Sequence, residues 1–429
     1  MFSVLLTNRD VRRLFIADNI SIMGDYFTYI ALAGLIKDST NSNLLVALVY
    51  VAFTMPAFFF SPVGGAVVDK FDRKQVLMIV SLMQAVCAVG LLFTSASTIW
   101  LGLLAQIGIT ALSAFINPAV SAALPNVVRN ADELRQANAL FGASWGAMVF
   151  LGAALGGFFS QTFGRTATFA VDIATFLIAA ALFALIKTPM QEKNLAPTRA
   201  PVRPWRDMRE AFHFAQSDHA IFALVASKAT FAVGAGAVSQ LAILAADAFQ
   251  SGDGGHGLLL AARGLGAALG PLIVTRLVRH NISLLLTVCG FSGFAFSLCY
   301  LGVSVAPSLG VACVCILAAH FGGGAQWTLS TLGLQMRSPD RLRGRVLAAD
   351  MALATLVMGL SSVGSGVLGE FFLSALPSQS WEAVRSWLPA VSCCLHIRCA
   401  VNCAASCRSS KPGAAPERAQ GPSEPGRRA

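Results

Sequence analysis

Long apolar stretches recur along the whole chain and are separated by short polar segments. Eleven of them are long enough to cross the hydrocarbon core of a bilayer, which takes about 20 helical residues. Most are apolar on all sides, as membrane helices are, and β-barrel alternation is absent. The predicted spans are residues 14–36, 43–68, 75–95, 98–123, 140–163, 166–187, 220–245, 256–275, 282–304, 307–333 and 347–376.

The composition agrees with a membrane protein. Charged residues make up 12% and hydrophobic residues 55% of the 429 positions, whereas soluble domains average about 25% charged residues. The net charge of +10 therefore does not indicate a nucleic-acid partner. No Walker phosphate loop, H-E-x-x-H or G-x-S-x-G motif occurs, and the six histidines form no metal-binding pattern. The sequence predicts neither an enzyme nor a cofactor.

The basic residues predict the orientation in the membrane. Up to residue 380, twenty of them fall on one side of the spans and only Lys37 and Arg165 on the other. Because cytoplasmic loops are enriched in Lys and Arg, we expect a multi-pass protein of the cytoplasmic (inner) membrane with a cytoplasmic N-terminus. The twenty are Arg9, Arg12, Arg13, Lys70, Arg73, Lys74, Arg129, Arg135, Lys187, Lys193, Arg199, Arg203, Arg206, Arg209, Arg276, Arg279, Arg337, Arg341, Arg343 and Arg345.

The longest connection on the basic side, Thr188–Gln216, divides the spans into six and five. The segment Asp132–Arg135 follows the fourth span and the similar Asp340–Arg343 follows the tenth, 208 residues later. Two related halves with a site between them are a common transporter architecture. We therefore predict an all-α polytopic membrane protein of two six-helix repeats: a first half at 1–187, a linker at 188–216 and a second half at 217–380.

The place of a twelfth helix, Trp381–Ala405, carries charges, a proline and several of the five cysteines between Cys393 and Cys407. It makes a poor span, and the Pro- and Arg-rich end after it is typical of disorder. We expect residues 381–429 to be a degenerate twelfth helix and a disordered tail, as a damaged or out-of-frame C-terminus would give. A metal site from C-x-x-x-C-x-x-x-C is the alternative.

Between the second and third spans the chain reads Gly65-Ala66-Val67-Val68-Asp69-Lys70-Phe71-Asp72-Arg73-Lys74. This resembles the G-x-x-x-D-[RK]-x-G-[RK]-[RK] loop of the major facilitator superfamily, with Asp72 in place of the second glycine. The resemblance implies a cytoplasmic gate, for which ordinary positive-inside decoration is the alternative. The implied gate residues are Gly65, Asp69, Lys70, Arg73 and Lys74, with Asp340, Arg343 and Arg345 as a possible counterpart in the second half.

Further segments narrow the resemblance. Asn117–Pro125 and Leu134–Leu140 are similar to the drug:proton antiporter branch of the superfamily, which includes macrolide-efflux and enterobactin-exporter proteins, and so are Asp172–Phe176 and Pro339–Val346. The resemblance implies the major facilitator fold and proton-coupled efflux of small amphipathic molecules by alternating access. An importer or lysophospholipid flippase on the same fold, or a non-transporting scaffold or receptor, are the alternatives.

The fifth span contains Gly152-Ala153-Ala154-Leu155-Gly156-Gly157. It is similar to the core of the antiporter motif of exporters, although Ala153 stands where the family has proline. Gly152, Gly156 and Gly157 would let this helix approach its repeat partner closely and seal a cavity. A purely structural packing role is the alternative.

Ionisable residues inside spans usually face an interior or a cavity. Asp18 and Asp25 lie seven residues apart on the first predicted helix, hence on about the same face, and Lys228 lies inside the seventh. In the family that the chain resembles, these two helices line the central cavity. Our hypothesis is that Asp25, with Asp18, takes up and releases a proton while Lys228 is its switchable partner. A static ion pair or no contact at all are the alternatives.

Other in-span residues have weaker interpretations. Arg263 would attract an anionic substrate, pair with Asp247 or Asp253, or extend to the outer headgroups, which we favour. We expect Asp172 and Glu370 to contact solvent near outer helix ends, and Asp350 to stabilise the start of the eleventh span. The candidates for lining a substrate cavity, each with helix packing as its alternative, are Gln106, Asn117, Trp145, Gln240, Arg263 and Trp327.

The expected partners are a small-molecule substrate, protons and membrane lipid, and the expected state is a monomer.

Overall fold

The computed structural model describes residues 3–191, 216, 218–278, 282–338 and 340–375, and these contain helices and no strands. Eleven helical segments are long and apolar enough to cross a membrane, so the prediction of an all-α polytopic membrane protein is confirmed. Most of the predicted linker and the whole predicted tail at 381–429 lie outside the described residues.

The elements are α1 Ser3–Thr7, α2 Arg9–Thr40, α3 Asn43–Lys70, α4 Arg73–Leu92, α5 Ile99–Val127, α6 Ala131–Phe163, α7 Arg165–Ala184, α9 His219–Val233, α10 Ala235–Ser239, α11 Leu241–Ile243, η1 Leu244–Ala248, α12 Gly252–Val278, α13 Ile282–Ser304, α14 Leu309–Arg337 and α15 Asp340–Ala375.

Several helices begin earlier than the predicted spans, because polar residues outside the apolar stretch cap them. The Asn8 side chain accepts hydrogen bonds from the amides of Asp10 and Val11, which starts α2 at Arg9. Asn130 caps α6 in the same way through the amide of Glu133. Such caps satisfy amides that have no partner within the helix, so the hydrophobic stretch alone underestimates the length of these helices.

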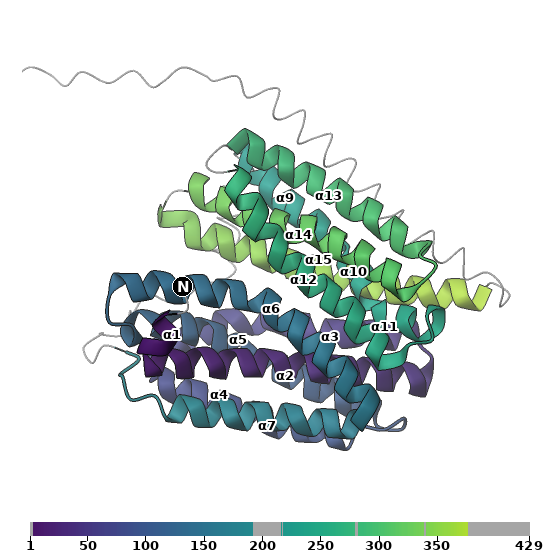
Figure 1. Cartoon of the computed structure of the whole chain (residues 1–429), viewed down its shortest axis with the longest axis horizontal. Coiled ribbons are helices and arrows are strands. Elements are labelled where there is room, and N and C mark those ends of the chain that lie inside the picture. The colour runs from purple at the N-terminus through teal and green to yellow at the C-terminus, as the bar shows by residue number, and fades with distance from the viewer. Residues whose placement is uncertain (1–2, 192–215, 217, 279–281, 339, 376–429) are drawn as a thin grey trace, which may run out of the picture.

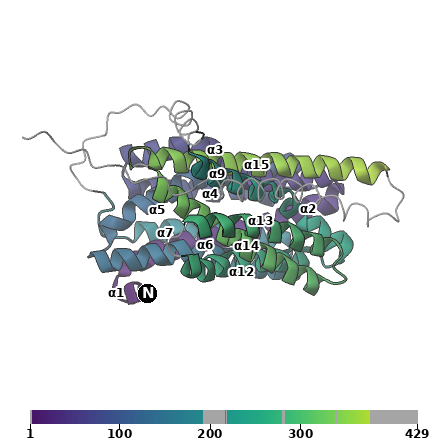
Figure 2. The same ribbon diagram turned by 90° about the horizontal axis from the view of Figure 1, so that it is seen from above.

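The helices form two sets that lie side by side (Figure 1), α1–α7 in purple to teal and α9–α15 in green to yellow. The sets meet mainly where α6 packs against α12 and where α3 packs against α15. Viewed from above, these two pairs lie toward opposite sides of the molecule (Figure 2). The ribbons of the two sets diverge toward the end of the bundle that carries the N-terminus.

The predicted seventh span is not one continuous helix. It is divided into α9, α10, α11 and the π-helical turn η1, with breaks at Gly234 and Gln240. Serines of α15 satisfy the backbone that the break frees: Ser361 accepts from the amide of Gly236 at 3.2 Å, and Ser365 donates to its carbonyl at 3.0 Å. A broken helix is tolerated at membrane depth when side chains replace its lost hydrogen bonds. Discontinuous helices of this kind are frequent at transporter binding sites.

Candidate functional site

Three carboxylates gather where α2 packs against α7. Asp18 is 7% and Asp172 0% exposed, and Asp25 interacts electrostatically with both. Asp172 accepts hydrogen bonds from Thr28 at 2.5 Å and Thr175 at 3.2 Å, while Asp25 Oδ1 is buried and has no hydrogen-bond partner among the described residues. We refer to Asp18, Asp25 and Asp172 as the acidic cluster.

The expectation that Asp172 contacts solvent at a helix end is wrong. Helix α7 begins at Arg165, so Asp172 lies seven residues, or about 10 Å, inside it. A Cβ at Gly24 would lie 2.3 Å from Asp172 Oδ1, which shows how closely the carboxylate is pressed against α2. The carboxylate is fully buried, and its threonine partners satisfy its oxygens there.

Lys228 pairs with Asp350, and both side chains are 1% exposed. The ammonium group also donates to Thr331 at 2.8 Å and lies 4.7 Å from the centre of the Trp327 ring. The prediction that Lys228 meets Asp18 and Asp25 is therefore wrong for this structure, because α15 supplies its partner within the second set. The expectation that Asp350 starts a helix is wrong as well. Since α15 begins at Asp340, Asp350 lies about 15 Å along it.

Arg263 points into the protein. Helix α12 begins at Gly252, so Arg263 lies eleven residues, or about 16 Å, from its start, too deep to reach the headgroups as we had expected. Its half-buried guanidinium lies among the hydroxyls of Tyr50, Tyr26, Tyr300 and Tyr29. We call these four residues with Arg263 the arginine–tyrosine cluster.

Asp247 and Asp253, the acids proposed for Arg263, pair with other cations. Lys37 lies 2.6 Å from Asp247, and Arg165 contacts Asp253 at 2.9 Å. Both pairs join the first set of helices to the second, at the end of the bundle opposite to the N-terminus. Glu370 contributes a third link there, because it is half-buried and accepts a hydrogen bond from Ser42 at the start of α3. Glu370 is partly exposed, as expected, but it also has this bond, which the sequence did not predict.

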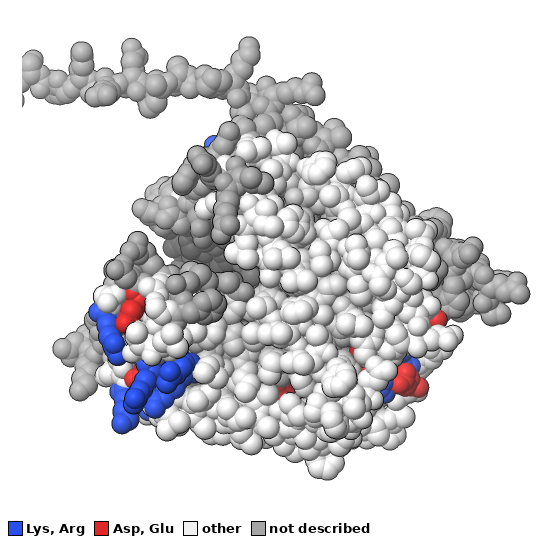
Figure 3. Space-filling model, viewed as in Figure 1, with Lys and Arg blue, Asp and Glu red and all other residues white. Residues whose placement is uncertain are grey.

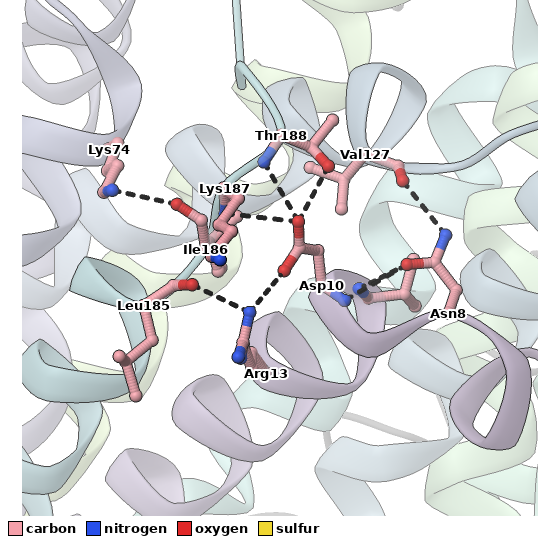
Figure 4. A network of polar contacts seen from close by, with 10 residues as sticks. Asn8, Asp10, Arg13, Lys74, Val127, Leu185, Ile186, Lys187 and Thr188 are labelled. Carbon is pink, nitrogen blue, oxygen red and sulfur yellow. Dashed lines mark hydrogen bonds and ion pairs between the residues drawn. The ribbon is translucent and has the colours of Figure 1, made fainter.

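Charged side chains on the surface gather at the two ends of the bundle. Figure 3 shows lysine and arginine gathered at one end of the bundle and a smaller group of acidic and basic side chains at the other. We call the first the basic end. At this end Arg13 donates to the Leu185 carbonyl and Lys74 to the Ile186 carbonyl, both at 2.8 Å, as Figure 4 shows. These cations satisfy carbonyls at the C-terminus of α7.

Two described residues of the predicted gate motif thus contact backbone oxygens. Besides Lys74, Arg73 donates to the carbonyls of Ala122 at 2.8 Å and Met190 at 3.0 Å. The Asp10 carboxylate accepts hydrogen bonds from the amides of Lys187 and Thr188 (Figure 4). Helix α2 therefore holds the segment that follows α7. The remaining predicted gate side chains lie outside the described set: Gly65, Asp69, Lys70, Asp340, Arg343 and Arg345.

The glycines of the predicted packing motif do lie at close helix contacts, but not with the expected partner. A Cβ at Gly152 or Gly156 would lie 3.0–3.2 Å from atoms of Met23 or Phe27 on α2. A Cβ at Gly157 would lie 2.7 Å from the Cα of Gly257 on α12. Helix α6 therefore uses this motif against α2 and α12, and not against its repeat partner α15.

The remaining cavity candidates are scattered. Gln106 is 1% exposed and bonds Thr110 one turn along its own helix, and Gln240 lies near Ser239 and Ser365 at the break in the seventh span. Trp327 lies at Lys228. Asn117 and Trp145 are exposed. The structure does not bring these five residues together.

Comparison with known proteins settles the family. The model of the transmembrane secretion effector family matches residues 4–403. The chain belongs to this family of major facilitator transporters. The resemblance deduced from the motifs is thereby confirmed.

Relatives and solved structures agree with this assignment. The transporter is 28% identical to the enterobactin exporter EntS of Shigella boydii over 403 residues, and 28% identical to EntS of Escherichia coli over 406 residues, with 89% of each chain covered in both cases. Its fold is similar to an inward-facing, occupied structure of a bacterial homologue of the human lysosomal transporter Spinster, with a TM-score of 0.71 at 13% identity, covering 93% and 96% of the two chains. A peptide transporter POT bound to alafosfalin gives a TM-score of 0.68 at 12% identity, with 94% and 95% covered.

The arginine–tyrosine cluster was missed in the sequence of this secretion-effector family transporter, although a signal was present. The chain has only four tyrosines, and two of them, Tyr26 and Tyr29, follow Asp25 within one helical turn. Residues three or four apart share a helix face, so this group pointed to one polar and aromatic face. No comparable spacing pattern indicated the other cluster residues, which lie on α3, α12 and α13.

Proposed function

We propose that this transporter is a proton-coupled exporter of small amphipathic molecules, working as a monomer in the cytoplasmic membrane with its N-terminus in the cytoplasm. The observation that carries the proposal is the acidic cluster. It places three carboxylates inside the first set of helices, and no Lys or Arg forms an ion pair with them among the described residues.

Carboxylates gathered in a low-dielectric interior repel one another when all are ionised. Binding of a proton removes one charge and lowers that repulsion, while loss of the proton restores it. Asp25 is the central member, because it interacts with both Asp172 and Asp18 and has an oxygen without a hydrogen-bond partner among the described residues. We therefore assign the coupling proton to Asp25 and its neighbours, and not to a pair with Lys228.

Alternating access requires that one end of the bundle closes while the other opens. The ion pairs that join the two sets, Lys37–Asp247 and Arg165–Asp253, lie at the end opposite to the basic end. If the basic end is cytoplasmic, as the distribution of Lys and Arg favours, these pairs close the outer side. The helices diverge at the other end (Figure 1), which supports an inward-facing arrangement.

The direction of transport is proposed from the relatives, since those named above are exporters of enterobactin. Import, lipid flipping, or a scaffold role without transport are the competing functions. A scaffold has no evident need for three carboxylates within its spans, because buried charges are costly in a membrane and mark ion or substrate pathways.

The test is flux in proteoliposomes with an imposed pH gradient, using naphthoate, naphthamide and naphthylmethylammonium as anionic, neutral and cationic amphipathic probes. We expect at least one probe to move against the proton flow. Asp25→Asn and Asp172→Asn should each lower gradient-driven flux about tenfold or more, because an amide cannot exchange a proton. Probe exchange without a gradient should persist.

Asp72→Asn is the matched control. Asp72 is exposed and caps α4 through the amide of Gln75, and asparagine caps a helix equally well, so flux should stay unchanged. Flux that ignores the gradient would reject proton coupling, and flux that remains gradient-driven in Asp25→Asn would reject the assignment of the coupling proton to Asp25. Transport in the same direction as the protons would indicate an importer, and no flux of any probe would favour the scaffold.

A further inference from the structure

All four tyrosines of the chain surround one arginine, although they come from three helices and both sets. Tyr26 and Tyr29 belong to α2, Tyr50 to α3 and Tyr300 to α13, whereas Arg263 belongs to α12. The guanidinium interacts electrostatically with the hydroxyls of all four tyrosines. The cluster therefore exists only where the first and second sets of helices face each other, as expected of a substrate site between two transporter halves.

Arg263 has no anionic partner among the residues that the structure describes. None of the ion pairs between described residues includes it, in contrast to Lys37, Arg165 and Lys228, which all have carboxylates. A guanidinium stays charged in proteins, and an uncompensated charge away from bulk water is unfavourable. Neutral phenol hydroxyls compensate it only in part. The cluster thus lacks one component, which is an anion.

The tyrosine hydroxyls also have hydrogen-bonding capacity to spare. Tyr300 is hydrogen-bonded to His320 at 2.9 Å, but the hydroxyls of Tyr29 and Tyr50 make no hydrogen bond to another described residue. The two side chains are 2% and 3% exposed, but neither hydroxyl is among the buried polar atoms that lack a partner. Hydroxyl donors that surround a guanidinium fork are suited to the oxygens of a carboxylate or a phenolate.

Aromatic rings from both sets of helices pack against the tyrosines of the cluster. On the first set the Phe53 ring lies 4.9 Å from Tyr29 and 5.4 Å from Tyr26. On the second set the Phe296 ring lies 4.7 Å from Tyr300 and 5.0 Å from Phe231. Offset or edge-on contacts at these spacings are favourable for aromatic groups, so these phenylalanines hold the tyrosines that would meet the ring of a ligand.

From these contacts we propose that the arginine–tyrosine cluster binds the anionic group of an aromatic substrate, with Arg263 holding the anion and Tyr26, Tyr29, Tyr50 and Tyr300 contacting it and the attached ring. This inference rests on the proposed transport function and gives it a substrate class, aromatic anions. It also gives the two sets different roles, because three tyrosines belong to the first set and the cation to the second. Relative movement of the sets would take the cluster apart and release the ligand.

The test is equilibrium binding to purified full-length protein in detergent, measured by calorimetry without any pH gradient. The probes are naphthoate, naphthamide and naphthylmethylammonium, which share one ring system and differ in charge, and cyclohexanecarboxylate, which keeps the anion and loses the aromatic ring. Naphthoate should bind at least tenfold more tightly than each of the other three. Equal affinity for naphthoate and naphthamide, or tighter binding of the cation, would overturn the proposal.

Variants locate the site. Arg263→Gln should remove the preference for naphthoate over naphthamide, while Arg263→Lys should keep a preference but weaken naphthoate binding several-fold, because lysine retains the charge without the fork. Tyr50→Phe should weaken naphthoate more than naphthamide. Arg337→Gln, in which the cation that pairs with Asp218 is lost at the basic end, is the matched control and should bind as the unchanged protein does. Arg263→Lys provides the test if Arg263→Gln does not fold, and an intact preference in a folded Arg263→Gln protein would refute the assignment.

Binding and transport can fail separately. A naphthoate preference that depends on Arg263, together with flux that ignores the pH gradient, would support the site and reject the proposed proton coupling. Gradient-driven flux of any probe without a naphthoate preference would support the proposed function and reject the site.

Discussion

Arg165 and Asp253 form a two-pronged ion pair that connects α7 of the first set to α12 of the second. The guanidinium Nε lies 2.9 Å from Oδ2 and Nη2 lies 3.0 Å from Oδ1. Asp253 also accepts a hydrogen bond from Ser160 of α6 at 2.5 Å, and the carboxylate is 7% exposed. Bidentate, charge-assisted hydrogen bonds are among the strongest in proteins. This pair therefore contributes strongly to holding the two sets of helices together at the end that we propose to be outer.

Asp253→Asn should loosen that end. The amide keeps one acceptor but loses the charge that attracts Arg165, and hydrogen bonds to charged groups contribute about 1.5–3 kcal/mol. Amide hydrogen exchange should therefore become faster at the ends of α6 and α12 that meet there, with little change at the basic end. Mass spectrometry of the protein in nanodiscs measures both regions at once. Unchanged protection around residues 157–165 and 252–257 would contradict a fastening role for the pair.

Gly157→Ala should destabilise the same contact by sterics alone. Its Cβ would lie 2.7 Å from both the Cα of Gly257 and the carbonyl oxygen of Asp253, and neither backbone atom can move without displacing α12. Overpacking of this kind costs about 1–3 kcal/mol, so the melting temperature should fall. Gly364→Ala is the control, because a Cβ at this helical position meets no atom within 4 Å. It should be neutral or slightly stabilising, and equal melting temperatures for the two variants would disprove the close contact.

Removing either partner of the buried Lys228–Asp350 pair should be much more damaging than removing both. Lys228→Met alone leaves an uncompensated carboxylate, and Asp350→Leu alone leaves an uncompensated ammonium group. Each single change should cost about 3–5 kcal/mol, while the double variant should recover most of the loss. A double-mutant cycle of thermal or denaturant unfolding in detergent measures the coupling. Additive losses would show that the two side chains do not depend on each other.

Acid should weaken the start of α9. Burial raises the pKa of Asp218, but the Arg337 guanidinium and the amides of Ile221 and Ala220 outweigh this, so the net pKa is below its usual value. A group with a lowered folded-state pKa stabilises the protein above its unfolded-state pKa of about 3.9 and loses that contribution as the pH falls further. Asp218→Asn should therefore melt lower than the unchanged protein at pH 7 and converge with it below about pH 4. Melting curves over this range check the prediction, and a difference that persists in acid would contradict it.

The membrane fold and the family could be predicted from the amino-acid order alone. The length and polarity of each span are local properties set by the thickness of the bilayer, so all eleven membrane-length helices could be predicted. The loop from Gly65 to Lys74 and the segment around Asn117 carried enough of the family pattern to indicate the superfamily and its branch. Capping residues such as Asn8 and Asn130 could have extended several helices to their observed starts.

Which polar side chains meet could not be predicted, because it depends on how the helices pack. Lys228 lies beside Asp350, not Asp25, because the rotation of α9 and its packing against α15 are set by contacts far apart in the sequence. The position of Arg263 depended on where α12 begins, which apolar stretches define only to within a few residues. Its four tyrosines come from helices of both sets, and their convergence follows from how those sets pack. A buried charge in a span indicates that it has a polar or charged partner. Which side chain that partner is depends on how the helices pack.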